Sequence, residues 1–300
     1  MRFAANPSEH VLQPAITSTL FPHLPQERSA PFRLALLAVT AALIVLGYLR
    51  LTGPFVAVAA AGIPALYGIY LYEVQVYEKE PAYAIGLTAG AGMALGAIWA
   101  LLSGHLVTET LILHAMPQGV PIGRVLLVGV LFPLVAQLLM LLGPVLLAAT
   151  RSPGRLLDGF AFGAASALGF VFAATLVFLT PELRAGPLAV GSGTLIALRS
   201  VLHGLLVPLV DVGTTGLPSA ALWLRGRRTR SWGRYGWVTS LWTGLAVAAV
   251  AQIGLGLVTV LVMNATVAML IYLAGAVALL FWVRIALHGM ILAEAGGRRN

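Results

Sequence analysis

Long apolar runs separated by short polar breaks are the dominant pattern of this chain. Eight runs occur, at about residues 32–48, 54–72, 82–102, 125–149, 159–179, 195–224, 238–263 and 265–287. A helix needs roughly 20 apolar residues to cross the hydrocarbon layer of a bilayer, and most of the runs are about that long. Helices satisfy their own backbone groups in lipid. The pattern therefore predicts an all-α fold, a polytopic membrane bundle of about eight transmembrane helices.

The composition indicates the same class, because too few residues are polar enough to face water. Hydrophobic residues make up 59% of the chain and charged residues only 9%, whereas a soluble domain has about 25% charged residues. The chain contains no cysteine, which excludes disulfides, thiolate nucleophiles and cysteine-ligated metals. We expect an integral, multi-pass membrane protein of a bacterial-type plasma membrane.

The basic residues predict how the helices are oriented. With the N-terminus inside the cell, 13 Arg and Lys residues lie on the inner side and three on the outer side. Positive residues concentrate in cytoplasmic loops, so both termini are expected in the cytoplasm. The organisation is then a polar tail over residues 1–31, the bundle over 32–290 and a second tail over 291–300. The net charge of +8 is assigned to contact with anionic membrane lipids, not with nucleic acid.

Ionisable side chains inside the apolar runs are the first candidates for function, because each is costly in lipid. The run over 195–224 carries Arg199, His203 and Asp211. Arg199 and His203 share a helix face, whereas Asp211 lies about 12 Å beyond His203 along the axis. One interpretation is a buried polar site. The other places Arg199 at the outer boundary and bonds His203 to a backbone carbonyl. We favour the boundary for Arg199 and a functional role for His203 and Asp211.

Other polar side chains favour structural roles. Gln137 and Gln252 are single amides within apolar runs, typical of side chains that join helices by hydrogen bonds. In the long connection expected over residues 103 to 124, His105, Glu109 and His114 do not match the His-Glu-x-x-His spacing of a zinc site. We interpret these three as ordinary polar residues of an outer loop.

Three motifs follow one another over about residues 55–225. They contain Glu73, Glu80 and Pro81 after the second run, then Asp158-Gly159 and Gly169-Phe170 in the fifth, and then Arg199 to His203 in the sixth. In this order and spacing they resemble the PrsW family of intramembrane metalloproteases. The resemblance implies a helical bundle with a polar site among three helices.

The resemblance also implies which positions would carry catalysis. The family has Pro-x-x-Glu-Glu-x-x-Lys on one helix, Gly-Phe-x-x-x-Glu on the next and a His on the third, which bind a metal or activate water. The matching positions here hold Ala136 and Gln137 for the paired Glu, Met140 for the Lys, Ala174 for the second-motif Glu and His203 for the His. Alanine cannot ligate a metal, and a glutamine amide is not a base near neutral pH. A catalytic zinc needs three protein ligands, so the resemblance implies an inactive relative without a metal.

The expected function is therefore non-enzymatic. The chain would bind or stabilise other membrane proteins in the groove that the family uses for substrate, without a cofactor. We expect His203 and Gln137 to face each other and to share a hydrogen bond. One alternative is a divergent active protease that uses zinc with His203, Asp211 and Glu73 or the outer histidines. A further alternative is a small transporter or lipid-binding protein built around Arg199 and Asp211. No inverted repeat of the kind common in transporters is visible.

Overall fold

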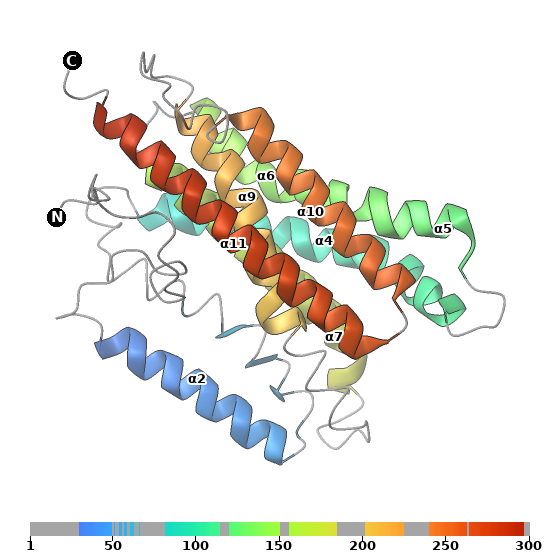
Figure 1. Cartoon of the computed structure of the whole chain (residues 1–300). Helices are drawn as coiled ribbons and strands as arrows, with labels where there is room; N and C mark the ends of the chain where they lie inside the picture. The colour runs from blue at the N-terminus through green and yellow to red at the C-terminus, as the bar shows by residue number, and fades with distance from the viewer. Residues whose placement is uncertain are drawn as a thin grey trace.

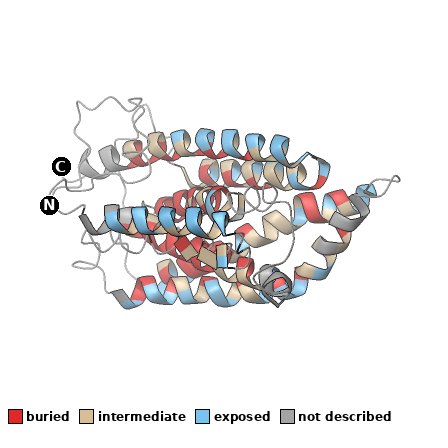
Figure 2. Ribbon diagram, turned by 90° about the horizontal axis from the view of Figure 1, so that it is seen from below, coloured by how far each residue is buried: buried red, intermediate tan, exposed pale blue. Residues whose placement is uncertain are grey.

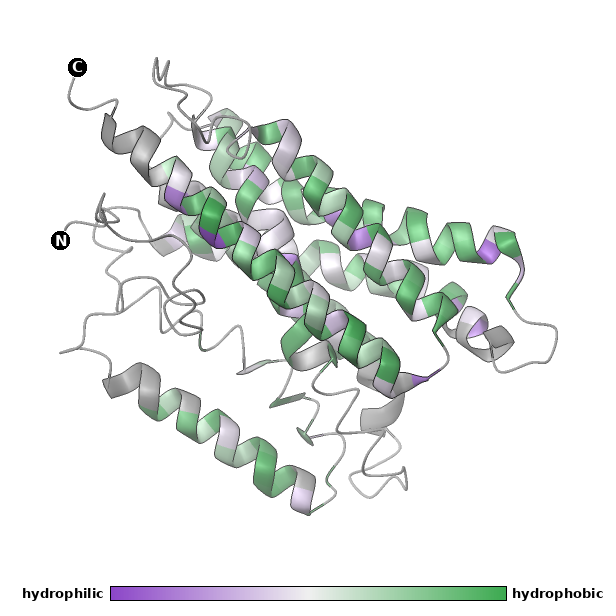
Figure 3. Cartoon of the chain, viewed as in Figure 1, coloured by the Kyte–Doolittle hydropathy of each residue, from purple (hydrophilic) through white to green (hydrophobic). Residues whose placement is uncertain are grey.

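All regular secondary structure in the described residues is helical. The computed structural model describes residues 30–49, 82–114, 120–150, 156–184, 202–224, 240–262 and 264–296, with a few positions between 51 and 66. In this part of the chain five helices are long and apolar enough to cross a membrane. Figure 3 shows that they are hydrophobic along most of their length. The all-α class is confirmed and the helices agree with a multi-pass membrane protein. The count of eight and the orientation stay predictions.

The helices follow the order of the apolar runs (Figure 1). Their bounds are α2 Ala30–Tyr48, α4 Ala82–His114, α5 Ile122–Leu126, α6 Phe132–Thr150, α7 Leu156–Arg184, α9 Val207–Leu224, α10 Leu241–Leu261 and α11 Ala265–Gly296. Two π-helical segments interrupt them, η3 Leu127–Leu131 before α6 and η4 Leu202–Leu206 before α9. Most of the run expected over 54–72 and the beginning of the run over 195–224 lie outside the described residues.

Helix α4 is longer than the apolar pattern predicts, because it continues to residue 114 where a connection is expected after residue 102. Its polar side chains explain this. Ser103 Oγ donates to Trp99 O at 2.7 Å, and Thr110 Oγ1 donates to Leu106 O at 2.7 Å. A hydroxyl that bonds a carbonyl one turn back is satisfied within the helix and does not end it. The predicted connection over 103–124 is therefore wrong in its first half.

Helices α7 and α11 also pass their expected ends. α7 includes Pro181, where a turn is expected, and ends at Arg184, and α11 ends at Gly296, inside the tail predicted over 291–300. Intrahelical hydrogen bonds keep the backbone satisfied in headgroups and water as well as in lipid. The end of an apolar run therefore marks the edge of the lipid layer and not the end of the helix.

Helix α7 lies in the centre of the bundle. In the apolar stretch of α7 that could cross a membrane, 67% of the residues are buried, whereas the share is 28–33% in the other four helices that could cross. Figure 2 shows the buried positions gathered in the middle of the molecule. On α4, a Cβ on Gly92 would overlap Ser166 O of α7, and a Cβ on Gly96 would overlap Phe170 O. Glycine at both positions lets the two backbones touch, which is how small residues bring helices together in lipid.

Helix α9 packs against another part of α7. A Cβ on Gly163 would lie 2.7 Å from Ser219 Cβ and 2.8 Å from Thr215 O. The rings of Phe162 and Trp223 close the end of this contact, with centroids 5.4 Å apart. α9 is buried at every position from 213 to 221, so it is enclosed by the other helices, and its polar side chains cannot reach lipid or water.

Helices α10 and α11 complete the enclosure of α9. α10 begins at the N-cap Ser240, whose Oγ accepts a hydrogen bond from Thr243 N at 3.1 Å. Its Gly256 lies against η3, where a Cβ would overlap Gly129 O and come within 2.6 Å of Pro133 Cγ. This close approach fixes how α10 is positioned along its axis relative to the start of α6. It also fixes the position of Gln252, which lies one turn before Gly256.

Candidate functional site

Five polar side chains from three helices meet inside the bundle. They are Gln137 of α6, Asp211, Thr214 and Thr215 of α9, and Gln252 of α10, and all five are buried. We call this group the polar joint. α6 and α10 carry no ionisable residue, and Asp211 is the one such residue in α9. Polar groups in apolar surroundings are costly unless hydrogen-bonded, so the bonds of the polar joint decide which helices pack together.

Pro218 explains how Gln137 is held. A proline has no N–H, so the carbonyl four residues earlier, that of Thr214, lacks its helical donor. Gln137 Nε2 donates to Thr214 O at 3.2 Å and to Thr215 Oγ1 at 3.2 Å. The exposed carbonyl needs a donor, which places the amide nitrogen of Gln137 toward α9 and leaves its oxygen for α10.

Gln252 continues the chain of hydrogen bonds. Its Nε2 donates to Gln137 Oε1 at 3.1 Å and to Asp211 Oδ1 at 2.6 Å, and Thr214 Oγ1 lies 3.2 Å away. An amide nitrogen has two hydrogens for these three oxygens. Because Gln137 presents its oxygen, Gln252 must present its nitrogen, and Oδ1 of Asp211 is therefore an acceptor. The carbonyl that Pro218 exposes thus fixes the direction of every bond up to Asp211.

A second proline joins α6 to α7 in the same way. Pro144 lies inside α6 and leaves Met140 O without a helical donor. Ser166 Oγ of α7 donates to Met140 O at 2.7 Å. Prolines are tolerated within membrane helices where a neighbouring side chain satisfies the freed carbonyl. α6 is therefore bonded to α7 through Met140 and to α9 through Gln137.

Tyr272 of α11 extends the polar contacts. Its hydroxyl donates to Leu255 O of α10 at 3.0 Å and shares a hydrogen bond of 2.7 Å with Thr259 Oγ1. Leu255 is three residues beyond Gln252, so the two contacts lie one turn apart on α10. Tyr272 therefore joins α11 to α10 one turn from the polar joint.

The positions matched to the family's catalytic groups lie in packed surroundings. Met140 and Phe170 belong to one buried apolar cluster, and Ala136 packs against it. Ala174 is buried one turn beyond Phe170 on α7. These positions of α6 and α7 are therefore in contact, and the sulfur of Met140 also lies 3.9 Å from the hydroxyl of Thr215.

The other motif residues of α7 have packing roles. A Cβ on Gly169 would overlap Ala89 O of α4, and a Cβ on Gly159 would lie 2.8 Å from Ser219 O of α9. Asp158 is buried in the first turn of α7, where a carboxylate is favoured by the helix dipole. These glycines explain part of the motif pattern by close helix contact.

Several predicted site residues lie outside the described residues. They are Glu73, Glu80, Pro81 and Arg199, together with the side chain of His203, whose backbone lies in η4. The predicted contact between His203 and Gln137 therefore stays a prediction. Among the described side chains, the partners of Gln137 are Thr215 and Gln252. From sequence alone Gln137 and Gln252 are predicted as separate amides, and the signal that would have linked Gln137 to α9 is Pro218, which exposes a carbonyl that needs a donor.

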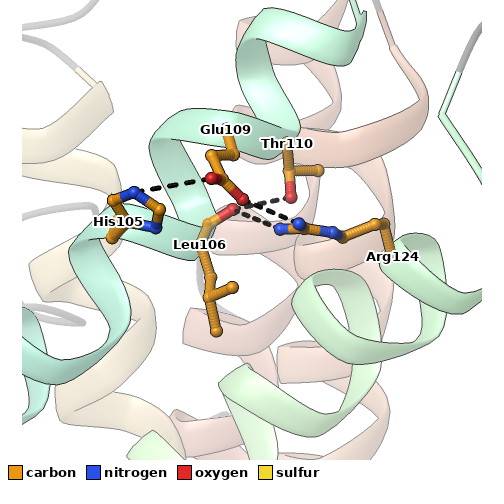
Figure 4. A network of polar contacts seen from close by, with 5 residues as sticks. All are labelled: His105, Leu106, Glu109, Thr110 and Arg124. Carbon is orange, nitrogen blue, oxygen red and sulfur yellow. Dashed lines mark hydrogen bonds and ion pairs between the residues drawn. The ribbon is translucent and has the colours of Figure 1, made fainter.

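A second polar group joins the end of α4 to α5 (Figure 4). Arg124 Nη2 donates to Glu109 Oε2 at 2.7 Å, and His105 Nε2 lies 3.4 Å from Glu109 Oε1. The hydrogen bond from Arg124 holds the pKa of Glu109 below its ordinary value, since it stabilises the charged form. Arg124 also approaches Leu106 O at 3.5 Å. The side chain of His114 lies outside the described residues, and the described contacts are those of a structural ion pair.

The polar joint offers one carboxyl, two amides and two hydroxyls, a set suited to interhelical hydrogen bonds. The described residues contain no group of three or more His, Cys, Asp or Glu side chains that could hold a metal ion. No protein-family model, no curated protein and no solved structure matches the chain. The likeness to the PrsW family therefore rests on the sequence motifs.

Proposed function

We propose that this chain is a multi-pass membrane protein of the PrsW type that lacks catalytic activity and binds other membrane proteins. The packing around Ala136, Met140 and Ala174 carries the proposal. Apolar side chains fill the positions where the family has charged ones. Peptide hydrolysis needs a titratable or metal-ligating group within hydrogen-bond reach of the scissile bond, and none of these three side chains is one.

Gln137 supports the proposal because its amide is already committed to structure. Its nitrogen bonds Thr214 O and Thr215, and its oxygen accepts from Gln252. An ionised glutamate at this position would have no N–H to donate to Thr214 O, and that carbonyl would be left without a donor. Glutamine supplies the donor and joins three helices, which fits a former catalytic position now used for packing.

A bundle without catalytic groups can still hold a transmembrane segment. The outward faces of α4, α10 and α11 carry exposed large apolar side chains, and in a membrane such faces meet lipid tails or the helices of other proteins. The family's substrates would be membrane proteins, and an inactive relative would keep the recognition and lose the cleavage. In the proposed orientation both termini and the basic stretch over residues 225–234 face the cytoplasm.

The test is to reconstitute the full chain in lipid nanodiscs together with single-span membrane proteins and to follow association and cleavage separately. The proposal predicts association with uncut proteins, unchanged by a metal chelator. Cleavage that the chelator stops, and that His203→Ala or Asp211→Asn abolishes, would establish a divergent active protease instead. Failure to associate with any single-span protein would contradict the binding part of the proposal.

A further inference from the structure

The carboxyl group of Asp211 has little around it to balance a negative charge. It is buried, and the one hydrogen bond that the described side chains give it comes from Gln252, a neutral amide, at 2.6 Å. A buried carboxylate needs an opposite charge or several donors to offset its lost hydration. A single amide donor does not meet that need.

In the described residues no cation forms an ion pair with Asp211, because the ion pairs found there join Glu109 to His105 and to Arg124. α6 and α10 carry no ionisable side chain at all. α11 contributes Tyr272, a neutral phenol, and Arg284, which follows Val283, a residue that packs against Gly213; Arg284 forms no ion pair with Asp211.

Among the described elements packed against α9, helix α7 and segment η4 hold the other ionisable groups. α7 has Asp158, Glu182 and Arg184 near its ends. Asp158 adjoins Gly159, which packs against Ser219, and Ser219 is about 12 Å along α9 from Asp211. η4 carries His203, whose side chain lies outside the described residues, so the experiment below includes a variant at that position.

We propose that Asp211 is a proton-binding site inside the bundle. A hydronium ion in water transfers a proton to the carboxylate: an O–H bond forms at Oδ2, the O–H bond of the hydronium breaks, and a water molecule is left. Oδ2 is the atom assigned because Oδ1 accepts the hydrogen bond from Gln252, in the direction that Pro218 fixes. The neutral acid keeps that hydrogen bond and removes a charge that the described side chains around it do not balance.

Binding of the proton is linked to the packing of α10. When the proton leaves, Oδ1 becomes a charged acceptor, and hydrogen bonds to charged acceptors are shorter and stronger. Asp211 then holds the amide of Gln252 more strongly in the short bond of 2.6 Å, and the longer bond from Gln252 to Gln137 Oε1, at 3.1 Å, weakens in competition. Proton release therefore loosens the bond between α10 and α6. This site is independent of the proposed function, because it needs neither a binding partner nor the PrsW resemblance.

Infrared spectroscopy of the purified full chain in nanodiscs tests the proposal, because a protonated carboxyl and a carboxylate absorb at different frequencies. At neutral pH the wild type should show a protonated-acid C=O band that is lost in Asp211→Asn. The control Glu109→Gln should keep this band and lose a carboxylate band, since Arg124 keeps Glu109 ionised. His203→Ala should also keep the acid band.

Three results with the Asp211 and His203 variants would overturn the proposal. The first is an acid band that survives in Asp211→Asn, and the second is a carboxylate band lost in that variant instead. The third is a shift of Asp211 from charged to neutral in His203→Ala, which would show an ion pair with the imidazole. If Asp211→Asn does not fold, Gln252→Leu replaces it. Loss of the hydrogen bond to Oδ1 should then move the acid band to higher frequency, and an unmoved band would contradict the assignment. The buffer cation is a further check, in which sodium replaces choline. An acid band that changes on this replacement would show that a metal cation binds at the site, and this would also contradict the proposal.

Discussion

The contact between α4 and α7 and the polar joint hold helices together by opposite means. In the first, Gly92 and Gly96 lack side chains, so two backbones touch. In the second, side chains of Gln137 and Gln252 bridge three helices by directional hydrogen bonds. The first contact depends on the absence of side chains at the two glycines, and a single added methyl group would overlap the facing backbone. The second depends on particular atoms, and an interhelical hydrogen bond in a membrane contributes only about 0.6 kcal/mol on average and about 1.7 at most.

The largest effect is expected from Gly96→Ala. The new methyl group would overlap the carbonyl oxygen of Phe170, and a backbone atom cannot rotate away, so α4 and α7 must separate. Overpacking of this kind costs about 1–3 kcal/mol or more, measured as a lower unfolding temperature in detergent. The control is Gly90→Ala on the same helix, where a Cβ has nothing within 4 Å. It should be neutral or stabilise by about 0.5–1 kcal/mol. Equal effects of the two changes would contradict the close contact.

A somewhat smaller loss is expected from Gly256→Ala. Its methyl group would overlap Gly129 O and push α10 away from η3, which also lengthens the bond from Gln252 to Gln137. We expect a cost of about 1–3 kcal/mol, at the lower end because α10 lies at the edge of the bundle and can shift. Gly254→Ala, two residues away and with nothing within 4 Å of its Cβ, is the matched control. Equal unfolding temperatures for Gly256→Ala and Gly254→Ala would contradict the close contact between α10 and η3.

The polar joint itself is tested by Gln137→Leu combined with Pro218→Ala. Gln137→Leu leaves Thr214 O without a donor and should cost about 1–2 kcal/mol. Pro218→Ala supplies an N–H that can bond that carbonyl within the helix, so the loss caused by Gln137→Leu should be smaller in the Pro218→Ala background. A double-mutant cycle of unfolding free energies measures this coupling. Strict additivity would show that Gln137 does not serve the carbonyl freed by Pro218.

The smallest effect is expected at the half-buried ion pair of Glu109 and Arg124. The pKa of Glu109 is lowered in the folded protein by the hydrogen bond from Arg124. Its stabilisation is therefore present above the ordinary carboxyl pKa and is lost as the pH falls through the lower folded value. Wild type should lose more stability than Glu109→Gln on acidification below about pH 4.5. Parallel pH profiles of the two unfolding temperatures would argue against the ion pair.

Helices were predictable from sequence here because the polar backbone of an apolar segment has few ways to satisfy its N–H and C=O groups in lipid. The ends of the helices were not, and α4 shows why. Ser103 and Thr110 read as polar loop residues, but their hydroxyls bond the preceding turn and let the helix continue. Hydropathy reports where the apolar layer ends, whereas a helix ends where its hydrogen bonds do.

The candidate site was predictable only in part. That Asp211 would be buried and that Gln137 would join helices followed from the cost of polar groups in lipid. Their partners did not follow, because the neighbours of a helix depend on glycine contacts such as Gly163 with Ser219, which pair residues far apart in sequence. Pro218 indicates that a carbonyl of α9 needs a donor from elsewhere, but the sequence does not indicate which helix provides that donor.

Zinc content tests the central claim, that the motif positions form packing core in place of a catalytic centre. The full chain would be purified from cells grown with added zinc and analysed for metal per chain. With Ala136, Gln137 and Ala174 at the carboxylate positions, the account predicts far less than one zinc per chain, since a catalytic site needs three protein ligands. About one zinc per chain, lost in His203→Ala or Asp211→Asn, would contradict it.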